Sequence, residues 1–478
     1  MCGKLCFFII VICLAESAVL GNPVSCHSEN RSFYPYTGTK TPYSYVHNDT
    51  GGTMTLTNCE PTQIWMLVRH GTRYPGESII AQILNLTHIR DHIIMNNVFE
   101  TCASQYEKMD LKNWKPYPEL VPGKGKYLAV QGEKDLASLA ERIRAKLPIL
   151  FDWNVTKSFK FKSTATQRTI ASMRSFVERA FNISSKKILP MINNTSLHMI
   201  ELMHIQQNIT MQHIPLPGGE ASSNTSIKFE VVPIVNDTLL KLYDNCTSWK
   251  SRGINKEVKA FINGLEMAKV LGDVSQRLGL MNISKEDIFL FYDLCRFERT
   301  LHLDKPSPWC YVFTDEEMRV LEYEEDLFYY YNGGPGEEIN SQLGCYLIRD
   351  MVDHFTKLEV NDDEPKGVFY FTHSQMMMLF LTAMRIVQNP IALTATNFRD
   401  MDHRNWRISQ LVPFAANFAA VFHRCNSSDA PFKVVFYLNE NPLIIEGCEN
   451  EVCDWMQLKK KLDAIATNCS MEVCKKKL

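Results

Sequence analysis

Several short runs along the chain have the hydrophobic pattern of β-strands. Residues 64–68 (IWMLV) are continuously apolar and follow Pro61, which is the pattern of a strand buried on both faces. Residues 158–163 alternate phenylalanine with lysine, which is typical of a strand with one buried face. Further strand patterns come late in the chain, at 367–372, 418–422 and 433–438.

Apolar residues at helical spacing follow the strand patterns. They occur at 133–147, between Gly132 and Pro148, and again at 170–181 and 376–386. Strands that alternate with helices are typical of the α/β class, in which helices cover both faces of a sheet. We therefore expect an α/β fold with a mixed sheet.

Residues 190–335 lose this alternation. Helical patterns at 238–243 and 258–271 are the main features there, with a Pro- and Gly-rich loop at 215–219. We expect a mainly α-helical domain inserted at 185–335, an α/β domain formed by 55–184 and 336–478, and an irregular N-terminal segment at 22–54.

The first residues have the pattern of a secretory signal. Lys4 precedes the apolar run 5–15, and small residues follow up to Gly21, so we expect residues 1–21 to be a signal peptide. A membrane span needs about 20 apolar residues, and Glu16 ends this run too early. No later stretch is long enough, and neither an endoplasmic-reticulum retrieval signal nor a GPI signal follows. Secretion is the expected destination, and retention in the endoplasmic reticulum lumen stays open.

Cysteines and glycosylation sequons agree with an oxidising compartment. Three of the fifteen cysteines lie in the expected signal peptide, and the even number left favours disulfide bonds whose pairing stays open. No C-x-x-C pair accompanies the H-x-x-x-H pair His88 and His92, so no zinc site is expected. Fourteen N-x-[ST] sequons, eight of them between Asn182 and Asn282, predict a glycoprotein.

The charge of the chain is balanced. Lys+Arg 51 against Asp+Glu 53 gives a net charge of −2, and the pI is about 6.7. General nucleic-acid binding requires a basic surface, so nucleic acid is not an expected partner. An anionic substrate would require positive charge gathered in one pocket.

The residues directly after the first predicted strand carry the strongest chemical signal. Arg69 and Arg73 flank His70 at the carboxyl end of a strand, where α/β sheets place their ligands. Guanidinium groups bind two phosphate oxygens and stay charged, and an imidazole between them can attack phosphorus. Gly71 allows close approach of the backbone. The alternative is a basic surface turn with a structural histidine, but the preceding strand, Gly71 and Pro75 favour a phosphate site.

Residues 69–75 (RHGTRYP) resemble the signature of the histidine acid phosphatases, the branch of the phosphoglycerate-mutase-like superfamily that includes phytases. The resemblance implies two-step hydrolysis of a phosphomonoester without metal or other cofactor. It further implies that His70 is the nucleophile, which forms a phosphohistidine, and that Arg69 and Arg73 bind the phosphate.

Two later segments extend the resemblance. Residues 163–168 (STATQR) resemble the family segment with the third phosphate-binding arginine, which would be Arg168. His373 closes the strand pattern at 367–372 and resembles the second family histidine, which also contacts the transferring phosphate. An arginine that opens a helix is more often a surface group, and a lone histidine at a strand end is usually structural. Both roles therefore depend on the resemblance.

Within the family, the chain is most similar to the multiple inositol polyphosphate phosphatases. The similarity covers roughly residues 60–445 and is weakest at 185–230. The supporting stretches are 233–246, 307–328, 412–422 and 438–440.

One position departs from the family pattern. Relatives follow the second histidine with Asp or with Ala-Glu, whose carboxyl group protonates the leaving alcohol, whereas this chain has His373-Ser374-Gln375. Gln375 stands at the proton-donor position but cannot supply a proton, and loss of a general acid costs roughly 10²–10⁴ in rate. Three explanations stay open. Another acid supplies the proton, a water molecule held by Gln375 relays it, or the enzyme is slow or inactive. The five other matching site residues favour retained activity.

We therefore expect a secretory-pathway phosphatase that acts on small phosphorylated molecules. By resemblance its substrates are inositol polyphosphates, such as inositol hexakisphosphate, with 2,3-bisphosphoglycerate as a second family substrate. The alternatives are a secreted phosphate-ligand binding protein on a weakened phosphatase scaffold and a broad-specificity acid phosphatase.

Overall fold

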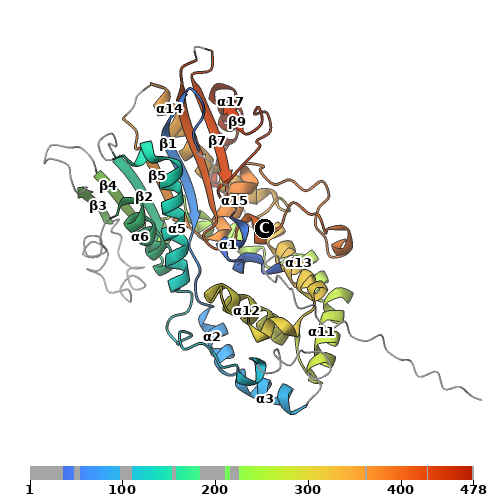
Figure 1. Ribbon diagram of the computed structural model, residues 1–478. Helices are drawn as coiled ribbons and strands as arrows, with labels where there is room; N and C mark the ends of the chain where they lie inside the picture. The colour runs from blue at the N-terminus through green and yellow to red at the C-terminus, as the bar shows by residue number, and fades with distance from the viewer. Residues whose placement is uncertain are drawn as a thin grey trace, which may run out of the picture.

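A computed structural model describes most of the 478-residue chain, namely residues 36–47, 54–96, 110–152, 158–182, 210–215, 226–360, 363–427 and 429–475. Within these residues an α/β body and a helical region lie side by side (Figure 1).

One mixed sheet forms the centre of the α/β body, as the sequence predicts. Its strand order is β3-β4-β2-β5-β1-β6-β7-β8, with β9 paired to β7. The segment β4-β2-β5-β1 is parallel, and the other pairs are antiparallel. The described strands are β1 (Cys59–Arg69), β2 (Ser158–Thr164), β3 (Thr210–Pro215), β4 (Ser226–Val232), β5 (Gly367–Thr372), β6 (Asn417–Cys425), β7 (Phe432–Leu438), β8 (Asn441–Pro442) and β9 (Val452–Asp454).

Helices cover both faces of the sheet. They are α5 (Val130–Lys146), α6 (Gln167–Phe181), α14 (Glu338–Val360), α15 (Ser374–Ala383) and α17 (Trp455–Ala466), with the short η4 (Pro148–Phe151) and α16 (Ile408–Leu411). Ile64 and Met66 of β1 pack with α5 and α6, whereas Trp65 and Leu67 pack with α14 and α15. Successive side chains of a strand point to opposite faces, so a continuously apolar strand is covered on both sides.

The helical region shares its hydrophobic core with the face of the sheet that α14 and α15 cover. Its helices are α2 (Glu77–Leu84), α3 (Thr87–Met95), η6 (Ile234–Asn236), η7 (Leu242–Asn245), α9 (Thr247–Ser251), α10 (Lys256–Ile262), α11 (Leu265–Leu278), α12 (Lys285–Leu301), η8 (Pro308–Val312), α13 (Asp315–Asn332) and η9 (Phe398–Asp400). Trp114 packs edge-on against Trp309 at 5.2 Å, and its indole donates to Glu298 at 2.7 Å. This core therefore joins the segment between β1 and β2 to the segment between β4 and β5.

The domain boundaries differ from those expected. The range 185–335 contains β3 and β4, which extend the sheet by pairing beside β2. The helices α2 and α3, expected within the α/β domain at 55–184, instead lie in the helical region, where α2 packs against α12. The apolar residues Ile80, Ile83 and Ile93 of these two helices are buried there.

Two segments of this region that have a helical pattern also differ from the expectation. Residues 238–243 form no α-helix, because the Asp237 carboxylate accepts from the backbone of Leu239 and Leu240 and holds the chain in a turn. The pattern at 258–271 is divided between α10 and α11, with Gly264 as the residue before α11.

Residues 36–47, which we call the N-terminal strap, join the two parts of the molecule. They belong to the segment expected to be irregular and contain two short helices, η2 (Gly38–Lys40) and α1 (Tyr43–Val46). Lys40 donates to Glu325 of the helical region at 3.0 Å, and Tyr43 donates to Glu440 of the α/β body at 2.8 Å. The strap therefore bridges the two parts.

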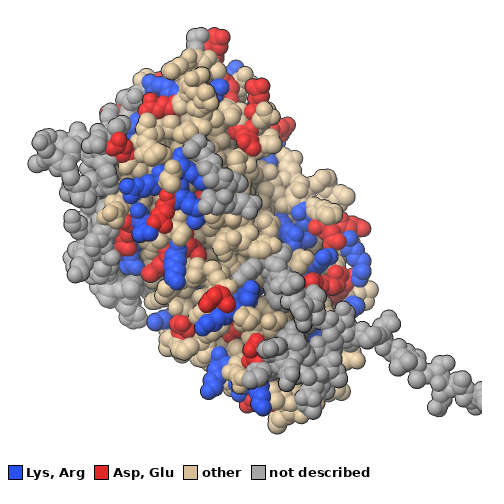
Figure 2. Space-filling view, viewed as in Figure 1, with Lys and Arg blue, Asp and Glu red and all other residues tan. Residues whose placement is uncertain are grey.

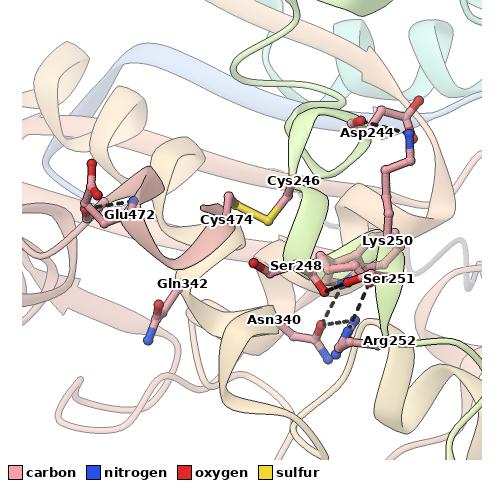
Figure 3. Close-up of a disulfide and its surroundings, with 12 residues drawn as sticks. Asp244, Cys246, Ser248, Lys250, Ser251, Arg252, Asn340, Gln342, Glu472 and Cys474 are labelled. Atoms are coloured by element: carbon pink, nitrogen blue, oxygen red, sulfur yellow. Dashed lines mark hydrogen bonds between the residues drawn. A yellow bond between two sulfur atoms is a disulfide. The ribbon is translucent and has the colours of Figure 1, made fainter. Parts of the chain in front are cut away.

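Disulfide bonds confirm the prediction that the cysteines pair. The pairs among the described residues are Cys59–Cys425, Cys246–Cys474, Cys295–Cys310, Cys345–Cys469 and Cys448–Cys453, whereas Cys26 and Cys102 lie outside the described residues. Figure 3 shows Cys246, which precedes α9, bonded to Cys474 in η10 (Met471–Cys474). The C-terminal segment is thus tied to both α14 and the helical region.

The described surface carries mixed charges and exposed sequon asparagines. None of the helices in the described part of the chain is long and apolar enough to cross a membrane, and the expected signal peptide lies outside that part. Lys and Arg are interspersed with Asp and Glu on the face drawn in Figure 2. The sequon asparagines whose side chains are described are exposed: Asn85, Asn182, Asn245, Asn282, Asn426 and Asn468.

Candidate active site

Three neighbouring parallel strands end at one edge of the sheet, and the predicted site residues follow them. Arg69 ends β1 and leads to His70 and Arg73, Arg168 lies in the first turn of α6 after β2, and His373 follows β5. Because β2, β5 and β1 are adjacent and parallel, their carboxyl ends bring these five residues together.

His70 has a defined tautomer. Its Nδ1 lies 2.9 Å from the carbonyl oxygen of Gly71. A carbonyl only accepts, so Nδ1 carries the hydrogen and Nε2 keeps its lone pair. Burial, together with the charges of Arg168 and Arg69, holds the pKa of His70 well below its ordinary value. The ring is therefore neutral, with Nε2 able to act as a nucleophile.

The loop after β1 is fixed by close backbone packing. A Cβ atom on Gly71 would lie 2.4 Å from the carbonyl oxygen of Gly132, and one on Gly132 would lie 2.1 Å from that of Thr72. Only glycine fits at either position. The Gly71 N–H donates to Ser172 Oγ at 3.1 Å, and Thr72 donates to Asp135 through its N–H and its hydroxyl. The loop is thus attached to both α5 and α6.

Arg69 is held by backbone oxygens. Its Nη1 donates to the carbonyl groups of Thr39 at 2.7 Å and Val412 at 2.6 Å, and its Cζ lies 4.5 Å from the centre of the Phe414 ring. Its buried Nε has no hydrogen-bond partner within the described residues. Burial and the charge of Arg73 lower the pKa of Arg69 to about 9.

Arg168 and His373 contact each other across the site. An Nη atom of Arg168 lies 3.3 Å from Nδ1 of His373, and Nε2 of His373 lies 3.3 Å from Thr164 Oγ1. A guanidinium only donates, so Nδ1 of His373 accepts and Nε2 carries the hydrogen. Burial and the charge of Arg168 hold the pKa of His373 well below its ordinary value. The rings of His70 and His373 are 5.5 Å apart.

Three arginines concentrate positive charge at the site. In the part of the chain that the structure describes, Arg69, Arg73 and Arg168 form no ion pair with a carboxylate. Burial and the charge of Arg73 lower the pKa of Arg168 to about 10. Repulsion and burial together make this arrangement costly in the absence of an anion. Its chemistry fits phosphate, which guanidinium groups bind through paired oxygens.

Glu325 of α13 acts electrostatically on both Arg69 and Arg73, and Asp293 of α12 also acts on Arg73. Glu325 accepts from Lys40 at 3.0 Å and pairs with Arg296. Although burial raises it, the charges of Arg296 and Lys40 lower the pKa of Glu325 to about 2. Glu325 therefore stays ionised near neutral pH and has no proton to donate.

The structure turns the amide of Gln375 towards the helical region. Its Nε2 donates to the carbonyl oxygen of Asn332, at the end of α13, at 2.9 Å. One of the two amide hydrogens of Gln375 is thus engaged in a contact between α15 and α13.

The sequence did not predict several residues that lie near the site. Thr39 contributes a backbone carbonyl, which any residue type supplies, and it is far from Arg69 in the chain. Phe414 and Glu325 lie in stretches that resemble the family, but the resemblance assigns neither residue a role. Lys126 and Lys241 add positive charge, since burial and then Arg73, Arg168 and Lys241 lower the pKa of Lys126.

The chain is similar to several known proteins. The family model of the histidine phosphatase superfamily (branch 2) matches residues 62–439. The multiple inositol polyphosphate phosphatase 1 of Drosophila melanogaster is 31% identical over 91% of this chain and 86% of its own length. The human protein of that name is 26% identical over 92% of this chain and 88% of its own length. The crystal structure of the phytase from D. castellii superposes with a TM-score of 0.69, at 16% identity, over 96% of this chain and 91% of that one.

The chain belongs to the histidine phosphatase superfamily, branch 2. It is a phosphatase with the mixed α/β fold of that superfamily.

Proposed function

We propose that the chain hydrolyses inositol polyphosphates through a phosphohistidine formed on His70. The observation that carries the proposal is the neutral imidazole of His70, with its free Nε2, among three arginines that have no carboxylate partner within the described residues.

The reaction has two steps. Nε2 of His70 attacks phosphorus while the bond to the leaving oxygen breaks, and water then hydrolyses the nitrogen–phosphorus bond and releases orthophosphate. Arg69, Arg73 and Arg168 neutralise the phosphoryl oxygens in both transition states. His373 sits against Arg168 and contacts the transferring group. Because Gln375 has no acidic proton, departure of an alkoxide is the step we expect to be slow.

A multiply charged substrate fits the wider surroundings. Lys126 and Lys241 add their charges to those of the arginines. Positive charge beyond the reacting phosphate favours an ester with several phosphates. Relatives that carry the name multiple inositol polyphosphate phosphatase 1 support the same substrate class.

The test is release of phosphate from inositol hexakisphosphate by the wild type, by His70→Ala and by His88→Ala. His88 is an exposed histidine of α3 and serves as the matched control. We expect His70→Ala to lose turnover by several orders of magnitude, about as nucleophile removal does in other covalent enzymes, and His88→Ala to keep it. A phosphorylated wild-type intermediate, absent from His70→Ala, should be trapped by rapid quenching. Equal release by wild type and His70→Ala would refute the nucleophile assignment.

A secreted phosphate-ligand binding protein is the second candidate, and the amide at Gln375 favours it. It predicts saturable binding of inositol hexakisphosphate without release of phosphate. A broad-specificity acid phosphatase would instead hydrolyse a small aryl phosphate as well as the inositol ester. Measuring binding and both rates on one preparation separates the three.

We also propose that the protein passes through the secretory pathway. The disulfide bonds and the exposed sequon asparagines support this. Expression in a eukaryotic cell should yield a protein whose mass falls on treatment with an N-glycosidase; an unchanged mass would contradict the glycoprotein prediction.

A further inference from the structure

The carboxyl end of α13 meets the beginning of α15 beside the phosphate site. A helix leaves its last four carbonyl groups without partners inside the helix. The following loop takes two of those of α13: Tyr329 O accepts from the N–H groups of Gly333 and Gly334, and Tyr330 O accepts from that of Gly336.

Side chains from other elements take the remaining two. Asn340 Nδ2, in α14, donates to Tyr331 O at 2.9 Å. Gln375 Nε2, in α15, donates to Asn332 O at 2.9 Å. The end of α13 is therefore fully capped, and its last carbonyl depends on Gln375.

Gln375 acts together with a second residue of α15. Thr382 lies two turns further along the same helix and donates its hydroxyl to Gly333 O at 3.0 Å. A Cβ atom on Gly333 would lie 2.6 Å from Nε2 of Gln375, so the glutamine side chain rests directly on this glycine. One face of α15 thus holds two consecutive carbonyls at the end of α13.

The capped end of α13 carries groups that face the phosphate site. Tyr329 and Glu325 are four residues apart and share one helical face. Glu325 accepts from the hydroxyl of Thr39 at 2.5 Å, and the carbonyl group of Thr39 accepts from Arg69 at 2.7 Å, so α13 is linked to the site through Thr39. Burial also raises the pKa of Tyr329 to about 12, against the opposing charges of Arg69 and Arg73. A shift of this helix end would move Tyr329 relative to the arginines.

We propose that Gln375 is a positioning residue whose amide caps α13 and holds the helical region against the phosphate site, and that it takes no part in proton transfer. The kinetic part of this inference rests on the proposed function. Asn332 O only accepts, so the group that faces it must donate. An amide donates at every pH, whereas an ionised carboxyl group at this position would repel the carbonyl.

The first test is the pH dependence of thermal stability in Gln375→Glu. The carboxyl group that this substitution introduces can donate to Asn332 O when it is protonated, which raises its folded pKa above the unfolded value of about 4.3. The stabilising contact is therefore present below that value and is lost as pH rises through the folded pKa. We expect the variant to match the wild type near pH 4 and to melt about 2–4 °C lower at pH 7.

The wild type is melted at each pH as the reference. Subtracting its melting temperature removes the contribution of the other titrating groups. Those on the two joined elements include His373, which precedes α15, and Tyr329, Tyr330 and Tyr331 at the end of α13. They also include carboxyl groups of α13, namely Glu322, Glu324, Glu325 and Asp326, and burial raises the pKa of Glu322 and of Glu324 to about 7. A constant difference between variant and wild type from pH 4 to pH 7 would overturn the cap.

The second test is the leaving-group dependence of turnover in Gln375→Met. Methionine keeps the length of the side chain but removes the donor, and Thr382→Val removes the neighbouring bond as a matched control. We expect both variants to lower the rates on inositol hexakisphosphate and on a nitrophenyl phosphate by the same factor, because a displaced helix affects phosphate binding and not protonation.

A selective loss of inositol-ester turnover in Gln375→Met, or a selective gain in Gln375→Glu, would place Gln375 at the leaving oxygen and overturn the proposal. Absence of turnover in the wild type would refute the proposed function, while the melting experiment would still test the cap.

Discussion

Buried arginines occur in two very different settings in this molecule. In the helical region, Arg277 forms a two-pronged pair with Glu317, at 2.8 and 3.0 Å, and also donates to Val312 O. At the carboxyl edge of the sheet, Arg69 and Arg168 are also largely withdrawn from solvent but have no carboxylate partner within the described residues.

The pKa directions follow this difference. Although burial lowers it, the charges of Glu325 and Asp293 raise the pKa of Arg296 in the helical region. Burial and Arg73 lower those of Arg69 and Arg168. A buried arginine that pairs with a carboxylate links two elements of the fold. A buried arginine without a carboxylate partner costs free energy until an anion binds. On the proposed function, the paired arginines support the fold, whereas the arginines at the edge of the sheet are available to bind a phosphate ligand.

The largest expected effect comes from breaking a paired arginine. Arg277→Met removes the partner of Glu317 and leaves a buried carboxylate, which also belongs to the N-terminal cap of α13. We expect the free energy of unfolding to fall by about 3–5 kcal/mol. Urea unfolding at pH 7 measures it; a loss below about 1 kcal/mol would mean that the pair is solvated in solution.

Acid should weaken the paired region through Glu325. The pKa of this carboxyl is about 2 in the folded protein against an ordinary value of 4.5. A depressed pKa gives stability that is present above 4.5 and is lost as pH falls towards 2, about 3 kcal/mol in all.

Glu325→Gln should remove that part of the acid dependence. The control is Glu472→Gln, which changes an exposed carboxylate. Unfolding free energies of both variants between pH 6 and pH 2.5 measure the slope. Identical slopes in Glu325→Gln and the wild type would contradict the assignment.

Phosphate should stabilise the unpaired site. An anion that binds only the folded state at 100 times its Kd adds about 2.7 kcal/mol to the free energy of unfolding. We expect orthophosphate to raise the Tm of the wild type while chloride at equal ionic strength does not. Equal shifts with both salts would mean that the arginines bind no specific anion.

The two settings differ in how far the sequence foretells them. The strands around His70, Arg168 and His373 follow from local patterns, since a buried strand and the loop after it are short-range features. The pairing of Arg277 with Glu317 and the contact of Gln375 with Asn332 O join distant segments, and the second uses a backbone atom that no residue type specifies. The strands β3 and β4 were not predicted, because the range 185–335 in which they lie is interrupted by sequons.

The smallest expected effect on stability comes from Arg168→Met, the same substitution as Arg277→Met but at an unpaired position. It removes a charge that lacks a carboxylate partner, as well as its repulsion with Arg73, so the free energy of unfolding without phosphate should change by less than about 1 kcal/mol or rise. The contact with His373 Nδ1 is the polar contact that limits the gain. Turnover of any phosphomonoester should nevertheless fall by about 10²–10³, as when a donor to the transition state is removed, and the stabilisation by phosphate should shrink with it. A loss of about 3 kcal/mol or more in the ligand-free protein would show that Arg168 supports the fold as Arg277 does, and the distinction between the two settings would fail at this residue.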